Sequence, residues 1–214
     1  MTLRIAIPIY ENCDLIDVAA PFDILSRITD FWYDDEVDLR IVAETASPVM
    51  TGQKVAITPH AAFDNFPQVD VLLVPGAYDV SNGKKKPFQD FIKAQSAQAQ
   101  WVTSVCTGAI VLAEAGLLDG YQATTHWAGL QTLRGYEKVK VVNGCPRWVH
   151  DRNRVTGGGV SSSLDAAIYL VSLLTNEHVA KCAQLIVQYN PHPPFAGGDP
   201  CVADYDTYIA VAGD

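Results

Sequence analysis

The sequence predicts an α/β protein with an open, mostly parallel β-sheet, helices on both faces and a small β-hairpin insertion. Short apolar runs alternate with stretches of helical periodicity along the chain. Several of these runs are apolar at consecutive positions, which is typical of parallel strands that helices cover on both sides. With 214 residues and 49% hydrophobic content, the chain can bury a substantial core, so we expect one domain over residues 1–214.

The first half of the chain shows this alternation most clearly. The expected elements, in order, are a strand at Leu3–Ile9, a helix at Val18–Ile28, strands at Val37–Ala43 and Val69–Val74, a helix at Phe88–Ala99 and a strand at Trp101–Val105. The hairpin insertion is predicted around Thr51-Gly52-Gln53, where β-branched residues flank a turn sequence.

The second half predicts shorter strands and a pair of terminal helices. The expected elements are a strand at Gln122–Thr125, a helical segment from Trp127, a strand at Lys138–Val142, a hairpin-like pair across Arg147–Val149 and Arg154–Thr156, and helices near Ser162–Leu174 and Glu177–Tyr189. Asp151-Arg152-Asn153 supplies the turn of this hairpin.

Cys106 lies where an apolar strand pattern passes into a helical pattern without a loop between them. Such a junction forces a strained backbone conformation and projects the side chain away from the sheet, provided that its neighbours are small. Ser104 and Gly108 meet that condition. The start of the following helix would lower the pKa of the thiol. We therefore expect a nucleophilic thiolate, and the alternative is a buried structural cysteine.

The other four cysteines lack this context. Cys182 shares a helical face with apolar residues, Cys145 lies in a Gly-Cys-Pro turn, Cys201 lies in a Gly/Pro-rich segment, and Cys13 follows the first strand. There is no Cys-x-x-Cys pair, so a zinc or iron–sulfur site is not expected. An odd number of cysteines fits a reducing compartment better than a disulfide framework.

Two further strand ends matter, because ligands of open α/β sheets bind outside the carboxyl ends of the strands. Gly76 follows the strand Val69–Val74, and a glycine there either lets a backbone N–H approach a ligand or forms an ordinary turn. Asp17 stands at the start of the first predicted helix, where the local sequence favours an N-cap over a role in a site.

Charge and hydropathy exclude several classes of protein. The net charge of −9 argues against a nucleic-acid partner, and Lys84-Lys85-Lys86, the one basic run, is interpreted as a solvated edge. No apolar run is long enough for a membrane helix, and the N-terminal apolar segment is too short for a secretory signal. We expect a cytoplasmic protein that binds neither membranes nor nucleic acid.

Taken together, several segments resemble the signature segments of the ThiJ/PfpI superfamily, whose fold is flavodoxin-like and similar to class I glutamine amidotransferases. These segments are Asp17-Val-Ala-Ala-Pro21, Val74-Pro-Gly76, Val102-Thr-Ser-Val-Cys-Thr-Gly108, Ala115-Gly-Leu-Leu-Asp-Gly120, Ala123-Thr-Thr-His-Trp127 and Thr156-Gly-Gly-Gly159. The resemblance covers most of the chain. Within the superfamily, the segments are similar to those of isonitrile hydratases, also called isocyanide hydratases, and of the N-terminal domains of AraC-type regulators.

The resemblance implies roles for individual residues. Cys106 would be the nucleophile, and Asp17 would be the acid hydrogen-bonded to it, in place of a simple cap. The backbone N–H groups of Gly76 and Thr107 would form an anion hole. The peptidase branch carries a histidine where this chain has Thr107, so peptidase activity is not expected. His126 would lie near the site without an assigned role. Many relatives have a second glycine at Ala77, which puts one donor of the hole in doubt.

The implied reaction is that of a lyase, the hydration of a small neutral isonitrile to an N-substituted formamide through a Cys106 thioimidate, with no metal or organic cofactor. Three alternatives stay open: a glyoxalase-like or deglycase-like reaction, a redox-sensing thiol, and a non-catalytic ligand-sensing module like that of the regulators. Members of the superfamily commonly form homodimers, and the same is expected here.

Overall fold

The computed structural model describes residues 2–32 and 36–201 of the chain. A seven-stranded sheet has the order β10-β11-β7-β6-β1-β2-β5. Its strands are β1 (Thr2–Pro8), β2 (Glu36–Ala43), β5 (Ala61–Ala62), β6 (Val71–Val74), β7 (Trp101–Ser104), β10 (Trp148–Asp151) and β11 (Arg154–Gly157). All neighbouring strands are parallel except β10 and β11. The open, mostly parallel sheet predicted from the sequence is confirmed.

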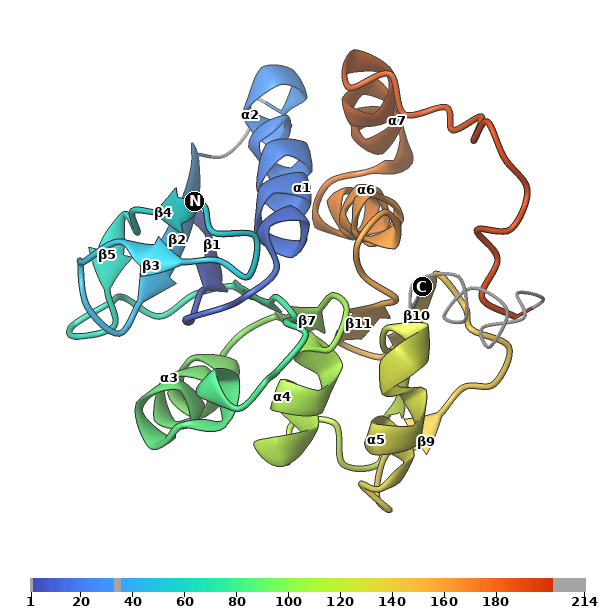
Figure 1. The fold of residues 1–214 in the computed structure, drawn as a ribbon. Helices are drawn as coiled ribbons and strands as arrows, with labels where there is room; N and C mark the ends of the chain where they lie inside the picture. Colours follow the sequence, from blue (N-terminus) through green and yellow to red (C-terminus); the bar gives the residue numbers. More distant parts are fainter. Residues whose placement is uncertain (1, 33–35, 202–214) are drawn as a thin grey trace.

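Helices cover both faces of this sheet (Figure 1). On one face lie α1 (Leu15–Ser26), α2 (Ile28–Phe31), α6 (Ser162–Leu174) and α7 (Glu177–Ile186). On the other face lie α3 (Lys86–Ser96), α4 (Gly108–Glu114) and α5 (Leu130–Arg134), together with the short 3₁₀ turns η1 (Asn82–Lys84) and η2 (Trp127–Gly129). Because both faces are covered, the central strands are apolar at consecutive positions, and all four residues of β6 are buried.

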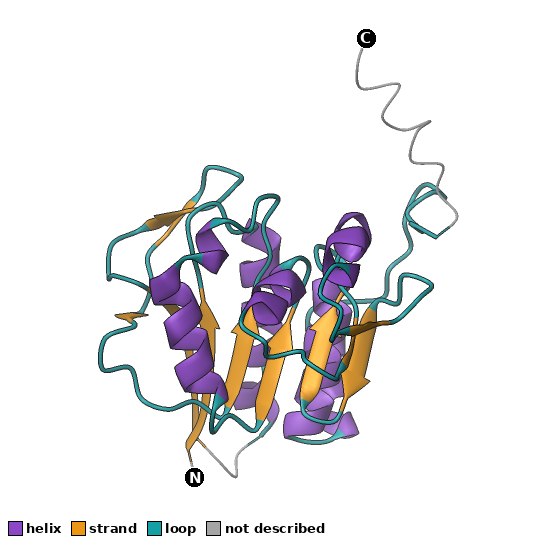
Figure 2. Cartoon of the chain, turned by 90° about the horizontal axis from the view of Figure 1, so that it is seen from below, coloured by secondary structure: helices purple, strands orange, loops and turns teal. Residues whose placement is uncertain are grey.

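The register of the central strands decides which loops meet at the carboxyl edge of the sheet. Val74 at the end of β6 pairs with Ser104 at the end of β7, and Thr156 of β11 also pairs with Ser104. The loops that begin at Pro75, Val105 and Gly158 therefore leave the sheet side by side. Figure 2 shows the strands lying next to one another between the helices.

Two small sheets stand apart from the main one. The predicted hairpin is confirmed as β3 (Val49–Met50) and β4 (Ala56–Ile57), which pair antiparallel. The predicted strands at Gln122–Thr125 and Lys138–Val142 form as shorter segments, β8 (Gln122–Ala123) and β9 (Lys140–Val141). These two pair with each other in parallel and not with the main sheet.

The ends of three helices differ from the sequence-based expectation. Helix α3 covers Lys86–Ser96 and not Phe88–Ala99, since Pro87 is tolerated in the first turn of a helix. Helix α1 begins at Leu15 and not at Val18, because the side chain of Asp14 accepts a hydrogen bond from Ile16 N and so caps the helix earlier. Helix α7 ends at Ile186, short of Tyr189. Among the residues placed by the structure, no helix is long and apolar enough to cross a membrane.

Candidate active site

Cys106 occupies the turn between β7 and α4 with φ of 54°, in the left-handed region that L-residues rarely adopt. The predicted strained junction is therefore present. Gly108 makes the turn possible, because a Cβ at that position would lie 2.2 Å from the carbonyl oxygen of Val74. The cysteine side chain is held in place rather than freely solvated, since only 6% of the residue is exposed.

Two glycines from the neighbouring loops pack directly against Cys106. A Cβ on Gly76 would lie 2.7 Å from the Cβ of Cys106, and a Cβ on Gly159 would lie 2.1 Å from it. Gly159 also has φ of 85°, which side chains disfavour. The loops after β6 and β11 thus approach the cysteine closely only because both positions lack a side chain.

Asp17 lies in the first turn of α1 and is fully buried. Its Oδ1 accepts hydrogen bonds from Val160 N at 2.8 Å and from Ser163 Oγ at 2.9 Å. Since Asp14 caps the helix, Asp17 is not the N-cap. Its Oδ2 has no hydrogen bond of ordinary geometry among the described residues, and the Cys106 thiol interacts with this carboxyl group. The structure brings Asp17 and Cys106 together.

Burial dominates the electrostatics of this pair. It raises the pKa of Asp17 to about 6, although the hydrogen bonds from Val160 and Ser163 oppose the shift. Burial also raises the pKa of the Cys106 thiol, and the negative charge of Asp17 raises it further. The backbone N–H of Thr107 acts in the opposite sense, by donating to the sulfur.

The expected lowering of the thiol pKa by the helix start is therefore wrong for the resting state. Desolvation and a neighbouring carboxylate outweigh the N–H groups of a seven-residue helix. Both shifts act on one pair of neighbouring groups in which the thiol is the weaker acid, so the thiol keeps its proton when Asp17 ionises. Such a pair titrates as a unit, and Asp17 is the base that can take the proton from the thiol.

The hydroxyl of Thr107 binds the loop after β6. Thr107 Oγ1 donates to the carbonyl oxygen of Ala77 at 2.6 Å and accepts from Ala77 N at 2.8 Å. The N–H of Ala77 is thus occupied and is not available as an anion-hole donor. Gly76 and Thr107, the residues expected to form the anion hole, lie together against Cys106: a Cβ on Gly76 would be 2.6 Å from Thr107 N and 2.7 Å from the Cβ of Cys106.

His126 lies at the edge of the site and caps the turn η2. Its Nδ1 accepts from Ala128 N at 3.4 Å, and burial lowers the pKa of the imidazole. His126, Gly159 and Val160 line a cavity of about 250 Å³, and Gly159 also packs against Cys106. The Nδ1 atom of His126 is tied to the backbone at the edge of this cavity.

The other four cysteines lie outside this pair. Cys13 is fully buried, and burial raises its pKa to about 12. The thiols of Cys145 and Cys201 hydrogen-bond to each other, which raises the pKa of Cys201 to about 11. The apolar residues on the helical face of Cys182 predict a buried core position, but the structure shows Cys182 only half-buried. No group of three or more His, Cys, Asp or Glu among the described residues could hold a metal ion.

Sequence reasoning missed Val160 and Ser163, which hold Asp17 in place. Val160 is β-branched and has φ of 52°, a strained combination that the hydrogen bond from its N–H to Asp17 helps to offset. The available signal was the run of three glycines, Gly157–Gly159, directly before a helix. Such a run predicts a close backbone approach, but not which carboxylate it meets.

Comparisons with known proteins agree with this geometry. The chain is 36% identical over 204 residues to the isonitrile hydratase of Pseudomonas putida, which covers 95% of this chain and 86% of that protein. It is 33% identical over 123 residues to the HTH-type transcriptional regulator GbdR of Pseudomonas aeruginosa, which covers 58% of this chain and 33% of the regulator.

The solved structures give the same result. A THiJ/PfpI family protein from Pseudomonas syringae superposes with a TM-score of 0.89 at 32% identity, over 99% of this chain and 85% of that one. Residues 3–173 match the model of the DJ-1/PfpI family. The matched residues include Asp17, Cys106 and the loops that contain Gly76 and Gly159. The chain belongs to the DJ-1/PfpI family.

Proposed function

We propose that this protein is a cysteine-dependent isonitrile hydratase, a lyase that adds water to an isonitrile and releases an N-substituted formamide. The observation that carries the proposal is the buried contact between the Cys106 thiol and the Asp17 carboxyl group, which lie together next to the glycine loops. The similarity to the hydratase of P. putida over 95% of the chain supports it.

In the first half of the proposed reaction, Asp17 takes the proton of the Cys106 thiol. The thiolate adds to the terminal carbon of the isonitrile, and Asp17 returns the proton to that same carbon. The product is a thioimidate, Cys106–S–CH=N–R. One base that becomes one acid is sufficient for this step, because the carboxylate takes the proton and then returns it.

In the second half, water adds to the thioimidate carbon. Asp17 takes one proton of this water and passes it to the former imine nitrogen, which gives a neutral tetrahedral intermediate, Cys106–S–CH(OH)–NH–R. As the hydroxyl proton leaves for the departing sulfur, negative charge develops on the oxygen, and the N–H groups of Gly76 and Thr107 would stabilise that charge. Collapse of the intermediate breaks the C–S bond, releases the formamide R–NH–CHO and restores the thiol of Cys106. The overall change is the addition of one water molecule to the isonitrile.

The burial of the pair favours a neutral substrate. Cys106 is only 6% exposed and Asp17 is fully buried. A charged substrate would have to leave water to reach them, which costs free energy unless a partner of opposite charge is present.

A second candidate is a non-catalytic ligand-sensing module. The similarity to the regulator GbdR over 58% of the chain favours it. A glyoxalase-like or deglycase-like reaction would use the same thiol on a 2-oxoaldehyde, so a turnover assay must include such a substrate.

The decisive experiment is a parallel turnover assay of the purified protein with an aryl isonitrile and with methylglyoxal, in which the formamide is quantified by chromatography. We expect formamide to accumulate and methylglyoxal to be consumed much more slowly. The Cys106→Ala variant should lose turnover, because no other group in the pair can form the thioimidate.

Cys182→Ala is the matched control, because Cys182 is half-buried on α7 and takes no part in the pair. It should retain wild-type turnover. Faster consumption of methylglyoxal than of isonitrile would support the deglycase-like alternative. Binding of an isonitrile without turnover would support the sensor.

A further inference from the structure

The peptide group between Pro75 and Gly76 is held by a buried phenol. Tyr10 OH donates a hydrogen bond to the carbonyl oxygen of Pro75 at 3.1 Å. The N–H on the other side of the same peptide group is that of Gly76, the donor assigned to the anion hole. A peptide group is planar, so a hydrogen bond that fixes its carbonyl also fixes the direction of its N–H.

The next peptide group, between Gly76 and Ala77, is held at both ends. Its carbonyl oxygen accepts from Asp14 N at 2.8 Å, and its N–H donates to Thr107 Oγ1. Of the four polar groups in these two peptides, three have partners. The N–H of Gly76 donates to no other group in the part of the chain that the structure describes. It is the one left for a ligand.

We propose that Tyr10 is a positioning residue for the reaction, acting through the Pro75–Gly76 peptide on the anion-hole N–H. Its hydrogen bond to the carbonyl would orient that N–H and polarise the amide, which makes the N–H a stronger donor. The inference rests on the proposed function, because it presumes that charge develops on an oxygen next to Gly76.

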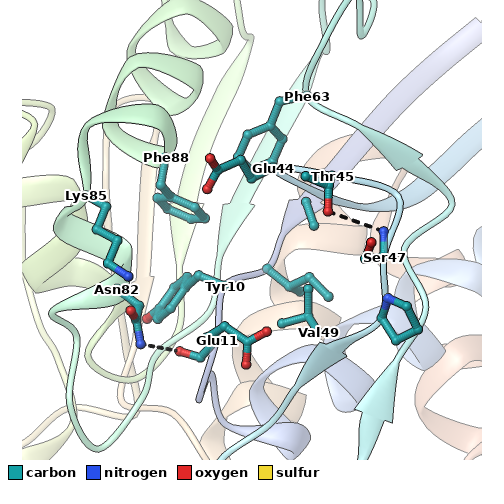
Figure 3. A pocket seen from close by; sticks show the side chains of 13 residues that line it. Tyr10, Glu11, Glu44, Thr45, Ser47, Val49, Phe63, Asn82, Lys85 and Phe88 are labelled. Atoms are coloured by element: carbon teal, nitrogen blue, oxygen red, sulfur yellow. Dashed lines mark hydrogen bonds between the residues drawn. The ribbon is translucent and has the colours of Figure 1, made fainter.

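The surroundings of Tyr10 suit this role. Its ring meets that of Phe88 edge to face at a centroid distance of 4.9 Å, and a Cβ on Gly83 would lie 3.1 Å from it. Figure 3 shows the two rings side by side on the wall of a cavity of about 320 Å³. Burial raises the pKa of the phenol, so it remains a proton donor across the working pH range.

The test is the Tyr10→Phe variant, which removes the hydroxyl and keeps the ring. We expect kcat for isonitrile hydration to fall about 5- to 20-fold, less than the ~10²-fold or more that follows direct loss of an oxyanion donor. KM should change less than twofold. The anion hole is proposed to act on the hydrolysis of the thioimidate. The thioimidate on Cys106 should therefore accumulate in the variant and be detected by intact-mass spectrometry during turnover.

Tyr121→Phe is the matched control. Its hydroxyl donates to Asn153 at 3.2 Å, immediately before β11 and so at the opposite end of that strand from Gly159. It loses the same group and should keep wild-type kcat and show no adduct. Both variants are assayed below their thermal transitions. If Tyr10→Phe keeps wild-type kcat without adduct while the wild type hydrates isonitriles, the positioning role is wrong and the hydratase stands.

A second measurement does not depend on turnover. In isotope-labelled protein, Tyr10→Phe should shift the carbonyl carbon of Pro75 and the amide nitrogen of Gly76 in the NMR spectrum, whereas Tyr121→Phe should leave both in place. If the wild type hydrates no isonitrile, the proposed function fails, but these resonances still show whether the Tyr10 hydroxyl acts on the Pro75–Gly76 peptide group. Unchanged resonances in Tyr10→Phe would overturn the positioning role of Tyr10.

Discussion

Asp17 is a destabilising residue at neutral pH, because its charge is buried. Burial raises its pKa to about 6 in the folded protein, from an ordinary value of 3.8. Between these values the folded state binds more protons than the unfolded state, so the free energy of unfolding falls as the pH rises from about 4 to 6. Two pKa units correspond to about 3 kcal/mol. Relative to neutral pH, the folded protein is more stable by this amount below the lower pKa, where Asp17 is protonated. The gain is lost as the pH rises through the higher pKa.

The Asp17→Asn variant should therefore be more stable than the wild type at pH 7, by as much as about 3 kcal/mol. An asparagine oxygen can still accept from Val160 and Ser163 without carrying a charge. The difference should shrink as the pH falls from 6 to 4. Turnover should drop at least ~10²-fold, since the amide cannot take the proton of Cys106. Urea unfolding at several pH values and isonitrile assays test both parts.

Asp23→Asn controls for the loss of one negative charge, because Asp23 lies exposed on the same helix. It should keep turnover. An Asp17→Asn protein that is less stable than the wild type at pH 7 would show that the carboxylate is stabilising where it stands.

The turn between β11 and α6 contacts both Cys106 and Asp17, the proposed nucleophile and base. Gly159 presses on Cys106, and the next residue, Val160, donates to Asp17. Two consecutive residues with positive φ, 85° and 52°, make this possible. Helix α6 begins immediately afterwards, with Ser162 Oγ donating to the carbonyl oxygen of Gly159. The strain is therefore confined to the turn and held by packing on both sides.

Gly159→Ala should damage both stability and activity. Gly144 offers a matched comparison, because it has nearly the same φ, 84°, but nothing within 4 Å of an added Cβ. Gly144→Ala should lower the free energy of unfolding by about 1–2 kcal/mol, because alanine is strained at positive φ, and it should leave turnover unchanged. Gly159→Ala adds a contact of 2.1 Å with Cys106, and forced overpacking costs about 1–3 kcal/mol more.

Denaturant titration and kcat/KM of the two variants test this comparison. Equal stability losses with unchanged kcat/KM in both would mean that the Gly159 turn does not constrain Cys106.

The sequence alone predicted the sheet, its hairpin insertion and the strained turn at Cys106 between β7 and α4, here called the elbow. These features depend on local periodicity and on small residues next to Cys106. It did not identify Asp17 correctly without the family resemblance, since Asp14 and Asp17 both suit a helix start and only the tertiary fold shows which one is buried. The sequence also predicted a lowered pKa for the Cys106 thiol, whereas the pKa is raised, and the reason is the same. Burial and the charge of Asp17 come from parts of the chain that local sequence does not bring together.

The site is a property of the whole sheet. Tyr10 follows β1, Gly76 follows β6, Cys106 follows β7 and Val160 follows β11, and these strands are neighbours in the order β11-β7-β6-β1. The two ends of the Asp17–Val160 hydrogen bond are separated by 143 positions in the chain. The proposed nucleophile, base and anion hole are therefore held in place by segments from most of the length of the sheet.

We therefore expect the site to disappear in the same transition as the fold. In a urea titration, tryptophan fluorescence should report on the sheet, because Trp101 lies half-buried on β7. Turnover and the protection of Cys106 from a thiol reagent, followed by peptide mass spectrometry, should change at the same midpoint as fluorescence. Exposed Cys201 should react without urea and serves as the internal control. If Cys106 became reactive and turnover were lost at clearly lower urea than the fluorescence change, the elbow would open locally, as a separate and less stable unit of the structure.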